Sequence, residues 1–178
     1  FDYAEGNTLH QKAASLCSVS YQSFPHGTMT TMHDLASLHD VDINAVTVAA
    51  FALCIAKHCQ AQQIIIGCQI HHDTVIPLIV QFGDGCDLAS VLHSINSQIT
   101  AARHGGPHTG MCLQNNLDEG QLKSAFAHIM VSIVPSAPVP SDAKHLALYF
   151  DAATGACMWV YNPDLFDPST VERVHTRM

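Results

Sequence analysis

Residues 45–56 form the segment that most constrains the fold, because apolar side chains surround it on nearly all sides. The run AVTVAAFALCIA contains no Gly or Pro, and Asp42 or Asn44 before it is a suitable helix N-cap. A helix that is apolar on most of its faces has to be buried on several sides. The sequence therefore predicts a central helix, around which the other elements pack.

Two apolar segments that are too short for helices follow this helix. QQIIIGCQI (62–70) and TVIPLIVQF (74–82) are rich in β-branched residues and are typical of buried strands. Pro77 has no N–H to donate, so we expect the second strand at a sheet edge or at a bulge. Only His71, His72 and Asp73 separate the two strands, which predicts a tight connection.

The clearest amphipathic helix comes next. It has Asp87 as its N-cap and Gly105 beyond its last turn. Its apolar residues recur at helical spacing and predict one buried face; they are Leu88, Val91, Leu92, Ile95 and Ile99.

The remaining elements are predicted from shorter signals. We expect a short strand within 12–21, a helix at 32–39 capped by Thr31, a strand at 125–135 that ends at a proline, and a surface loop at 135–144. Residues 145–163 alternate as a β-hairpin does, with a turn at AATG (152–155), and Asp167 with Pro168 opens a final helix. Strands that neighbour as hairpins, with few crossover helices, favour an α+β fold with a mixed sheet over a doubly wound parallel one.

Composition limits the class of protein and its partners. A chain of 178 residues predicts one domain. Apolar residues make up 48% of the chain and charged residues only 12%, which predicts a globular domain whose surface is partly covered by a neighbouring domain. The net charge of −8 has the wrong sign for binding nucleic acid or an anionic membrane. The seven cysteines form no C-x-x-C pair, and neither a signal peptide nor an apolar run of membrane-spanning length is visible. We therefore expect reduced thiols and a cytoplasmic location.

The thirteen histidines raise the question of a metal site. Cys54 and His58 stand at i and i+4 on the central helix, and Cys59 points elsewhere on it. A zinc site needs three or four converging ligands, and no second pair has the expected spacing. The favoured interpretation is a core thiol and a histidine at a helix end, with no metal ion.

Other candidate catalytic groups also have simpler interpretations. His71 and His72 beside Asp73 could supply a base with its orienting acid, but neighbours on an extended chain point in opposite directions. We interpret them as a polar turn, and the run from His104 to His108 as a helix C-cap and loop. Phe150 lies on one strand of the predicted hairpin, and Trp159 and Tyr161 lie on the other. These aromatic residues could form a stacking platform for a ligand, but packing in the core or at an interface is the favoured interpretation. No G-x-S-x-G, P-loop, H-E-x-x-H or EF-hand pattern is present in the sequence.

The order of the segments resembles that of nonribosomal peptide synthetase condensation domains. In that family a long buried helix precedes a strand with a G-x-P-x-type turn, as DINAVTVAAFALCIAKHCQAQQ precedes IIIGCQI here. TVIPLIVQF is similar to the family's N-T-x-P-L-R strand, DLASVLHSINSQITAARHGGP to its next helix, and VYNPDLFDPSTVERV to its closing Y-x-x-x-L-F-D-x-x-T-I-x-R segment. The resemblance covers residues 32–175. It implies a chloramphenicol-acetyltransferase-like lobe, the C-terminal one of the two lobes in that family.

The sequence departs from the family in ways that bear on catalysis. The family's catalytic H-H-x-x-x-D-G belongs to the N-terminal lobe, and HHDTVIP does not reproduce it, since Val75 and Ile76 stand where the Asp would be expected. The loop of a dozen or more residues that forms the floor of the family's active-site tunnel is replaced here by three residues. Ile79 stands where the pattern prefers arginine. We therefore expect no catalytic, cofactor-binding or metal-binding residues.

The resemblance implies a function as a truncated domain. We expect residues 1–178 to form one condensation-like lobe, with 1–31 as an extended lead-in, that packs on the adjacent adenylation domain. A carrier protein domain of the same polypeptide is a second candidate partner. The exposed face left by the other lobe would allow self-association. Two alternatives stay open: the C-terminal half of an active condensation domain that forms peptide bonds, and a small-molecule or metal-binding module that uses the histidines.

Overall fold

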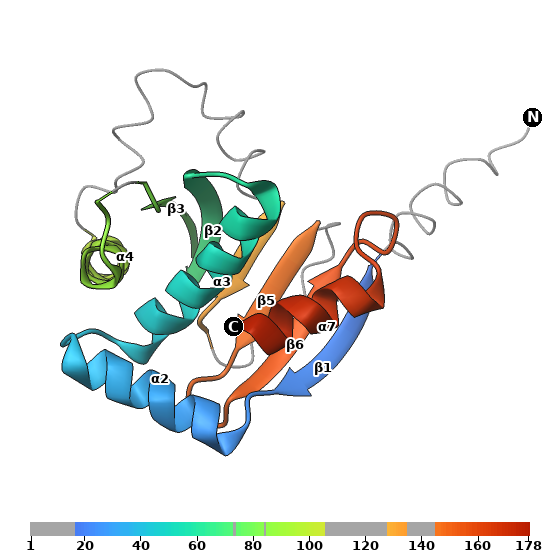
Figure 1. The fold of residues 1–178 in the computed structure, drawn as a ribbon, viewed down its shortest axis with the longest axis horizontal. Helices are drawn as coiled ribbons and strands as arrows, with labels where there is room; N and C mark the ends of the chain where they lie inside the picture. The colour runs from blue at the N-terminus through green and yellow to red at the C-terminus, as the bar shows by residue number, and fades with distance from the viewer. Residues whose placement is uncertain (1–16, 73, 84, 106–127, 135–144) are drawn as a thin grey trace, which may run out of the picture.

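The structure is a computed structural model that describes residues 17–72, 74–83, 85–105, 128–134 and 145–178 (Figure 1). Its elements in chain order are β1 (Ser18–Ser23), α2 (His26–Leu38), α3 (Ile43–Cys59), β2 (Gln63–His71), β3 (Thr74–Gln81), α4 (Leu88–Arg103), β4 (Ile129–Ser132), β5 (Leu146–Phe150), β6 (Ala156–Tyr161) and α7 (Pro168–Arg177).

The strands form one mixed sheet in the order β1-β6-β5-β4-β2-β3. β4 runs parallel to both of its neighbours, β2 and β5, and the other pairs are antiparallel. The first strand of the described chain pairs with the last, with Ser18 opposite Tyr161. This topology confirms the predicted α+β fold with a mixed sheet.

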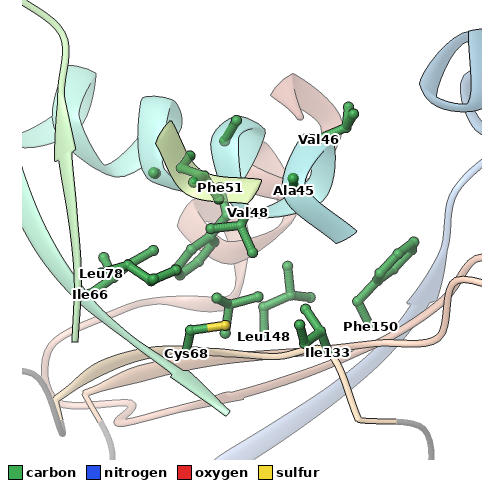
Figure 2. Packing of buried hydrophobic residues seen from close by; sticks show 14 of the residues in the cluster. Ala45, Val46, Val48, Phe51, Ile66, Cys68, Leu78, Ile133, Leu148 and Phe150 are labelled. Carbon is green, nitrogen blue, oxygen red and sulfur yellow. The ribbon is translucent and has the colours of Figure 1, made fainter. Parts of the chain in front are cut away.

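The helices pack on one face of the sheet, and α3 lies at the centre of that layer (Figure 1). Asp42 caps α3 by accepting a hydrogen bond from the Asn44 N–H at 2.8 Å, as predicted. Figure 2 shows Val48 and Phe51 of this helix above side chains of the sheet. The Phe51 ring lies 6.0 Å from that of Trp159, and both side chains are fully buried. Each large apolar side chain buried in this way contributes about 1.5–3 kcal/mol to folding.

β3 forms one edge of the sheet, as Pro77 predicted, and this edge is closed. The Phe82 N–H donates to the Gln62 carbonyl, so the even-numbered residues of β3 bond to β2 and the odd-numbered ones point outward. At the outward positions Pro77 has no N–H, and the Gln98 side chain of α4 bonds both the N–H and the carbonyl of Ile79, each at 3.1 Å. The edge therefore offers few free backbone groups to another strand.

The hairpin of β5 and β6 leads into α7, as predicted. The Asp167 carboxylate caps α7 by accepting from the Thr170 N–H at 2.9 Å. Hydrogen bonds from the side chain of Ser169 and then from Thr170 lower the pKa of Asp167 to about 2. Phe150, Trp159 and Tyr161 are buried in the core beneath the helices, which confirms their structural interpretation.

His175 fixes α7 against the far end of the sheet. Its ring stacks on Phe24 with centroids 4.7 Å apart, and its Nδ1 accepts the Trp159 Nε1–H at 3.4 Å. Burial lowers the pKa of His175, while a hydrogen bond with the backbone of Ser23 acts in the opposite direction. The folded structure therefore favours the neutral form of the His175 imidazole.

The predicted start of the helix at 32–39 is wrong, because α2 begins six residues earlier, at His26, after Pro25 as N-cap. Gly27 and the threonines of this first stretch are poor helix formers, which hid it. Thr31, predicted as the cap, lies inside the helix, and its hydroxyl donates to the Gly27 carbonyl at 3.0 Å. Leu38, the last residue of α2, is exposed.

Two strands differ from prediction in their bounds. β1 continues to Ser23, two residues beyond the predicted 12–21, and residues 12–16 lie outside the described part of the chain. β4 occupies Ile129–Ser132, and residues 125–127 and 135 of the predicted strand lie outside the described part of the chain. The predicted loop at 135–144 also lies outside the described residues.

Among the described residues, no single helix has the length and hydropathy of a membrane span. α2 and α3 reach them only when taken together, and the pair is bent by 110° at the break.

Candidate functional site

An apolar groove on the helical side is the candidate functional site. It lies between α2, α3 and α4 and has a volume of about 440 Å³. The bend between α2 and α3 spreads these two helices apart. Apolar residues from α2, α3, α4 and the neighbouring segments line the groove; these include Leu35, Val46, Leu53, Phe82, Val91 and Met178. Leu88, at the start of α4, also lines it and is 52% exposed.

The polar groups of the groove are few, and two of them, Asp87 and Thr31, stabilise the helices. Asp87 caps α4 by accepting the Ser90 N–H at 2.7 Å, and hydrogen bonds from Ser90 lower the pKa of its carboxyl. The Thr31 hydroxyl is engaged with its own helix. With its lining so apolar, the groove is suited to receive apolar side chains from a partner rather than to transfer protons.

The predicted pair Cys54 and His58 lies in a second groove, between α3 and α7. Lys57, Arg173 and Arg177 line this groove with them, so the surroundings are cationic and unfavourable to a metal cation. Burial raises the pKa of the Cys54 thiol. No group of three or more His, Cys, Asp or Glu in the described residues is placed to hold a metal ion.

His71 and His72 lie exposed at the tip of the β2–β3 hairpin. His71 ends β2 opposite Thr74, and the Gln69 side chain donates to the His72 carbonyl at 2.9 Å, which closes the turn tightly. Asp73 lies outside the described residues. His104 is the C-cap of α4, as predicted, and His108 is not described.

The described cysteines are free thiols. Cys68 and Cys157 lie in the core, where burial raises the pKa of each to about 12, so both stay protonated at neutral pH. Cys59 and Cys86 are exposed, and Cys112 is not described.

The second face of the sheet carries its own small cluster. Met130, Ala147, Tyr149 and Val160 are buried there, and Gln69 and Ser132 lie in register with Tyr149 across β2, β4 and β5. Gln69 Oε1 and Tyr149 Oη have no hydrogen-bond partner within the described structure. Apolar residues that stay exposed on this face lie at its two edges rather than at its centre: Val19 and Tyr21 on β1, and Val75 on β3.

The groove was not foreseen from the sequence. Each lining segment was predicted to be apolar, but the groove exists because α2 and α3 diverge, and no local pattern encodes that angle. One signal was available, since the run from Ala45 to Ala56 offers more apolar surface than the sheet can cover.

No family model and no curated protein matches the sequence. Solved structures do match in three dimensions. The first condensation domain of the calcium-dependent antibiotic synthetase is similar over 90% of this chain and 43% of its own, with a TM-score of 0.65 at 11% identity. VibH, a nonribosomal peptide synthetase condensation enzyme, is similar over 90% of this chain and 46% of its own, with a TM-score of 0.59 at 13% identity.

A longer synthetase chain is also similar. FmoA3, a nonribosomal peptide synthetase solved in its α-methyl-L-serine-AMP bound form, matches over 95% of this chain and 24% of its own, with a TM-score of 0.60 at 13% identity. This chain thus spans less than half the length of the condensation structures it matches. It has the fold expected from the resemblance, an α+β lobe of the condensation-domain type.

Proposed function

We propose that the chain is a truncated condensation-like domain that corresponds to the C-terminal lobe, lacks catalysis, and packs as a structural module on the neighbouring adenylation domain of a nonribosomal peptide synthetase. The single observation that carries the proposal is the fold: one sheet with one helical layer, similar to less than half of each condensation structure. The order from α3 to α7 follows the segments of that lobe in the family resemblance.

The β2–β3 hairpin supports the absence of catalysis. Intact family members place a longer loop there as the floor of the active-site tunnel, whereas His71 is already paired with Thr74 here. The histidines of this turn are exposed, and this sequence contains no H-H-x-x-x-D-G pattern. A lobe built in this way keeps its packing surfaces but has little tunnel wall.

The apolar groove supports docking. An exposed Leu88 at the rim of a groove with mostly apolar lining is typical of a surface that a partner covers. The similarity to FmoA3, whose structure holds an aminoacyl adenylate within one long chain, is consistent with an adenylation domain as that partner. We propose a carrier protein domain of the same polypeptide as a second partner, and a cytoplasmic location for the whole synthetase.

Expressing the adenylation domain of the native polypeptide with and without residues 1–178 tests the proposal. We expect the longer form to be more soluble, to melt at a higher temperature and to adenylate its amino acid at least as fast. Equal solubility and melting temperature for the two forms, or a native gene with no adenylation domain, would refute it.

A matched pair of variants tests the groove itself. Leu88→Lys places a charge in the groove, and Leu165→Lys places one on an equally exposed leucine outside it, since the two side chains are 52% and 55% exposed. We expect only Leu88→Lys to reduce the solubility and melting temperature of the longer form. The active-enzyme alternative predicts peptide-bond formation between carrier-bound substrates and an upstream H-H-x-x-x-D-G in the gene; finding both would replace the present proposal.

A further inference from the structure

The two edges of the sheet differ, and β1 is the open one. Pro77 and the Gln98 side chain close the β3 edge, as described above. β1 forms the opposite edge, and Figure 1 shows no described helix or strand beyond it. Its residues alternate between half-buried and exposed, with Val19 44% and Tyr21 77% exposed.

The backbone groups that face outward from β1 can be assigned. The Phe24 N–H donates to the Gly155 carbonyl at 3.0 Å, so the even-numbered residues of this strand bond to β6. Along an antiparallel strand the direction of these groups alternates. Val19 and Tyr21 therefore present to the outside N–H and C=O groups that no other described residue bonds, together with their exposed side chains.

β1 also lacks the features that protect natural sheet edges. The sequence SVSYQS contains no charged residue, no proline and no glycine, whereas protected edges carry lysine, proline or a bulge. An uncharged strand does not repel a second copy of itself.

We propose that β1 pairs with β1 of a second copy of this chain, antiparallel and two-fold symmetric, with Ser20 opposite Ser20 of the other copy. In this register Val19 lies opposite Tyr21 of the other copy, and the reverse pair follows by symmetry. Both members of each pair have outward-facing backbone groups, so each pair exchanges two hydrogen bonds. A pair of an aromatic and a β-branched residue is a favourable cross-strand combination, worth roughly 0.2–1 kcal/mol.

The size of the contact sets the expected strength. Six residues of an edge strand bury less than the roughly 800 Å² per partner of a stable complex. We therefore expect a weak dimer, with a dissociation constant on the order of tens to hundreds of micromolar. Each copy carries a net charge of −8, and salt screens the repulsion between them. Association should therefore strengthen as NaCl is raised, unlike a contact held by ion pairs. The proposal does not depend on the function proposed above.

Sedimentation equilibrium of the 178-residue chain tests the pairing. We expect a monomer–dimer equilibrium that Tyr21→Lys weakens at least tenfold. Leu38→Lys is the matched control, because Leu38 is 76% exposed and lies on α2, and it should leave the equilibrium unchanged. A monomer at several hundred micromolar in high salt, or equal loss in both variants, would overturn the proposal.

Cross-linking tests the register. Opposed residues of a non-hydrogen-bonded pair have Cα atoms about 4.5 Å apart, within the range that a disulfide spans. Ser20→Cys should therefore give an oxidised dimer linked through position 20, identified by peptide mapping. Gln22→Cys is the control, since two copies of position 22 would lie roughly 14 Å apart at about 3.4 Å per residue. Efficient linking through position 22, or none through position 20 in a protein that dimerises, would refute this register.

Val19→Pro tests the backbone directly. It removes an outward N–H and leaves the bonds to β6 in place, so we expect a monomer that melts close to the wild type. Ser20→Pro removes an N–H that faces β6 and should lower the melting temperature instead. A Val19→Pro protein that stays folded and dimerises like the wild type would contradict pairing at this edge.

Discussion

The Gln98 side chain is predicted to stabilise the fold by sealing the β3 edge, and Gln98→Ala measures how much. The side chain gives two hydrogen bonds to Ile79, one accepted from its N–H and one donated to its carbonyl. A neutral hydrogen bond contributes about 0.5–1.5 kcal/mol net. Both residues are half-buried, so water replaces part of what is lost. We therefore take the lower half of the range, about 0.5–1 kcal/mol per bond, or about 1–2 kcal/mol for the two bonds.

The expected result follows after a correction for the helix. Alanine is a better helix former than glutamine by a few tenths of a kcal/mol, so the net loss of unfolding free energy is about 1 kcal/mol, equivalent to a fall of roughly 2–4 °C in melting temperature for a chain of this size. Urea titration with an unchanged m-value gives the free energy. Hydrogen exchange of the Ile79 amide should accelerate in the variant.

Two further variants make the test specific. Ser97→Ala changes the exposed neighbour of Gln98 on the same helix and should alter stability by only a few tenths of a kcal/mol. Gln98→Glu keeps the acceptor but sets a carboxylate against the Ile79 carbonyl, which raises the pKa of the new carboxyl. Its stability should then be highest below the unfolded pKa and fall as pH rises through the folded one. The reasoning is refuted if Gln98→Ala matches the wild type in stability and in exchange at Ile79.

Three other outcomes are expected. Burial lowers the pKa of His175, so the unfolded chain takes up the proton first as pH falls. The free energy of unfolding should therefore decline below about pH 6.5. His175→Gln should flatten this part of a profile of melting temperature against pH, and an unchanged profile would count against a buried neutral ring. Asp167 has a folded pKa of about 2, so the stability from its cap should be present above the unfolded pKa and lost as pH falls through about 2; Asp167→Asn should show less acid dependence by thermal melting. Gly155→Ala should destabilise by about 1–2 kcal/mol, since Gly155 has φ +72° and a Cβ there would lie 3.0 Å from Met29, whereas Gly27→Ala, in open space on α2, should stabilise by about 0.5–1 kcal/mol in urea titrations.

Local signals predicted α3, α4, α7 and the hairpin of β5 and β6 well, because each combines a cap or a turn with a recognisable apolar pattern. Asp42, Asp87 and Asp167 all cap the helices for which the sequence proposed them. The start of α2 was missed because His26, Gly27 and the following threonines carry no such signal. The mixed sheet could be predicted only as a class, because the pairing of β1 with β6 joins segments at opposite ends of the chain.

The candidate surfaces depend on relations that sequence patterns do not record. The hydrogen bonds between Gln98 and Ile79 join residues nineteen positions apart on different elements. The groove depends on the angle between α2 and α3. The unprotected character of β1 could be read from SVSYQS, but its importance follows only from the strand order, which leaves it at an edge.

The pairing of β1 with β6 bears on how the chain folds during synthesis. β1 leaves the ribosome first of all the described strands, yet its partner is the last. Contacts between distant segments slow folding, and strands that wait for their partners are prone to aggregate. Nascent chains that stop before Tyr161 should therefore hold an unpaired β1 and depend on chaperones until the final strand closes the sheet.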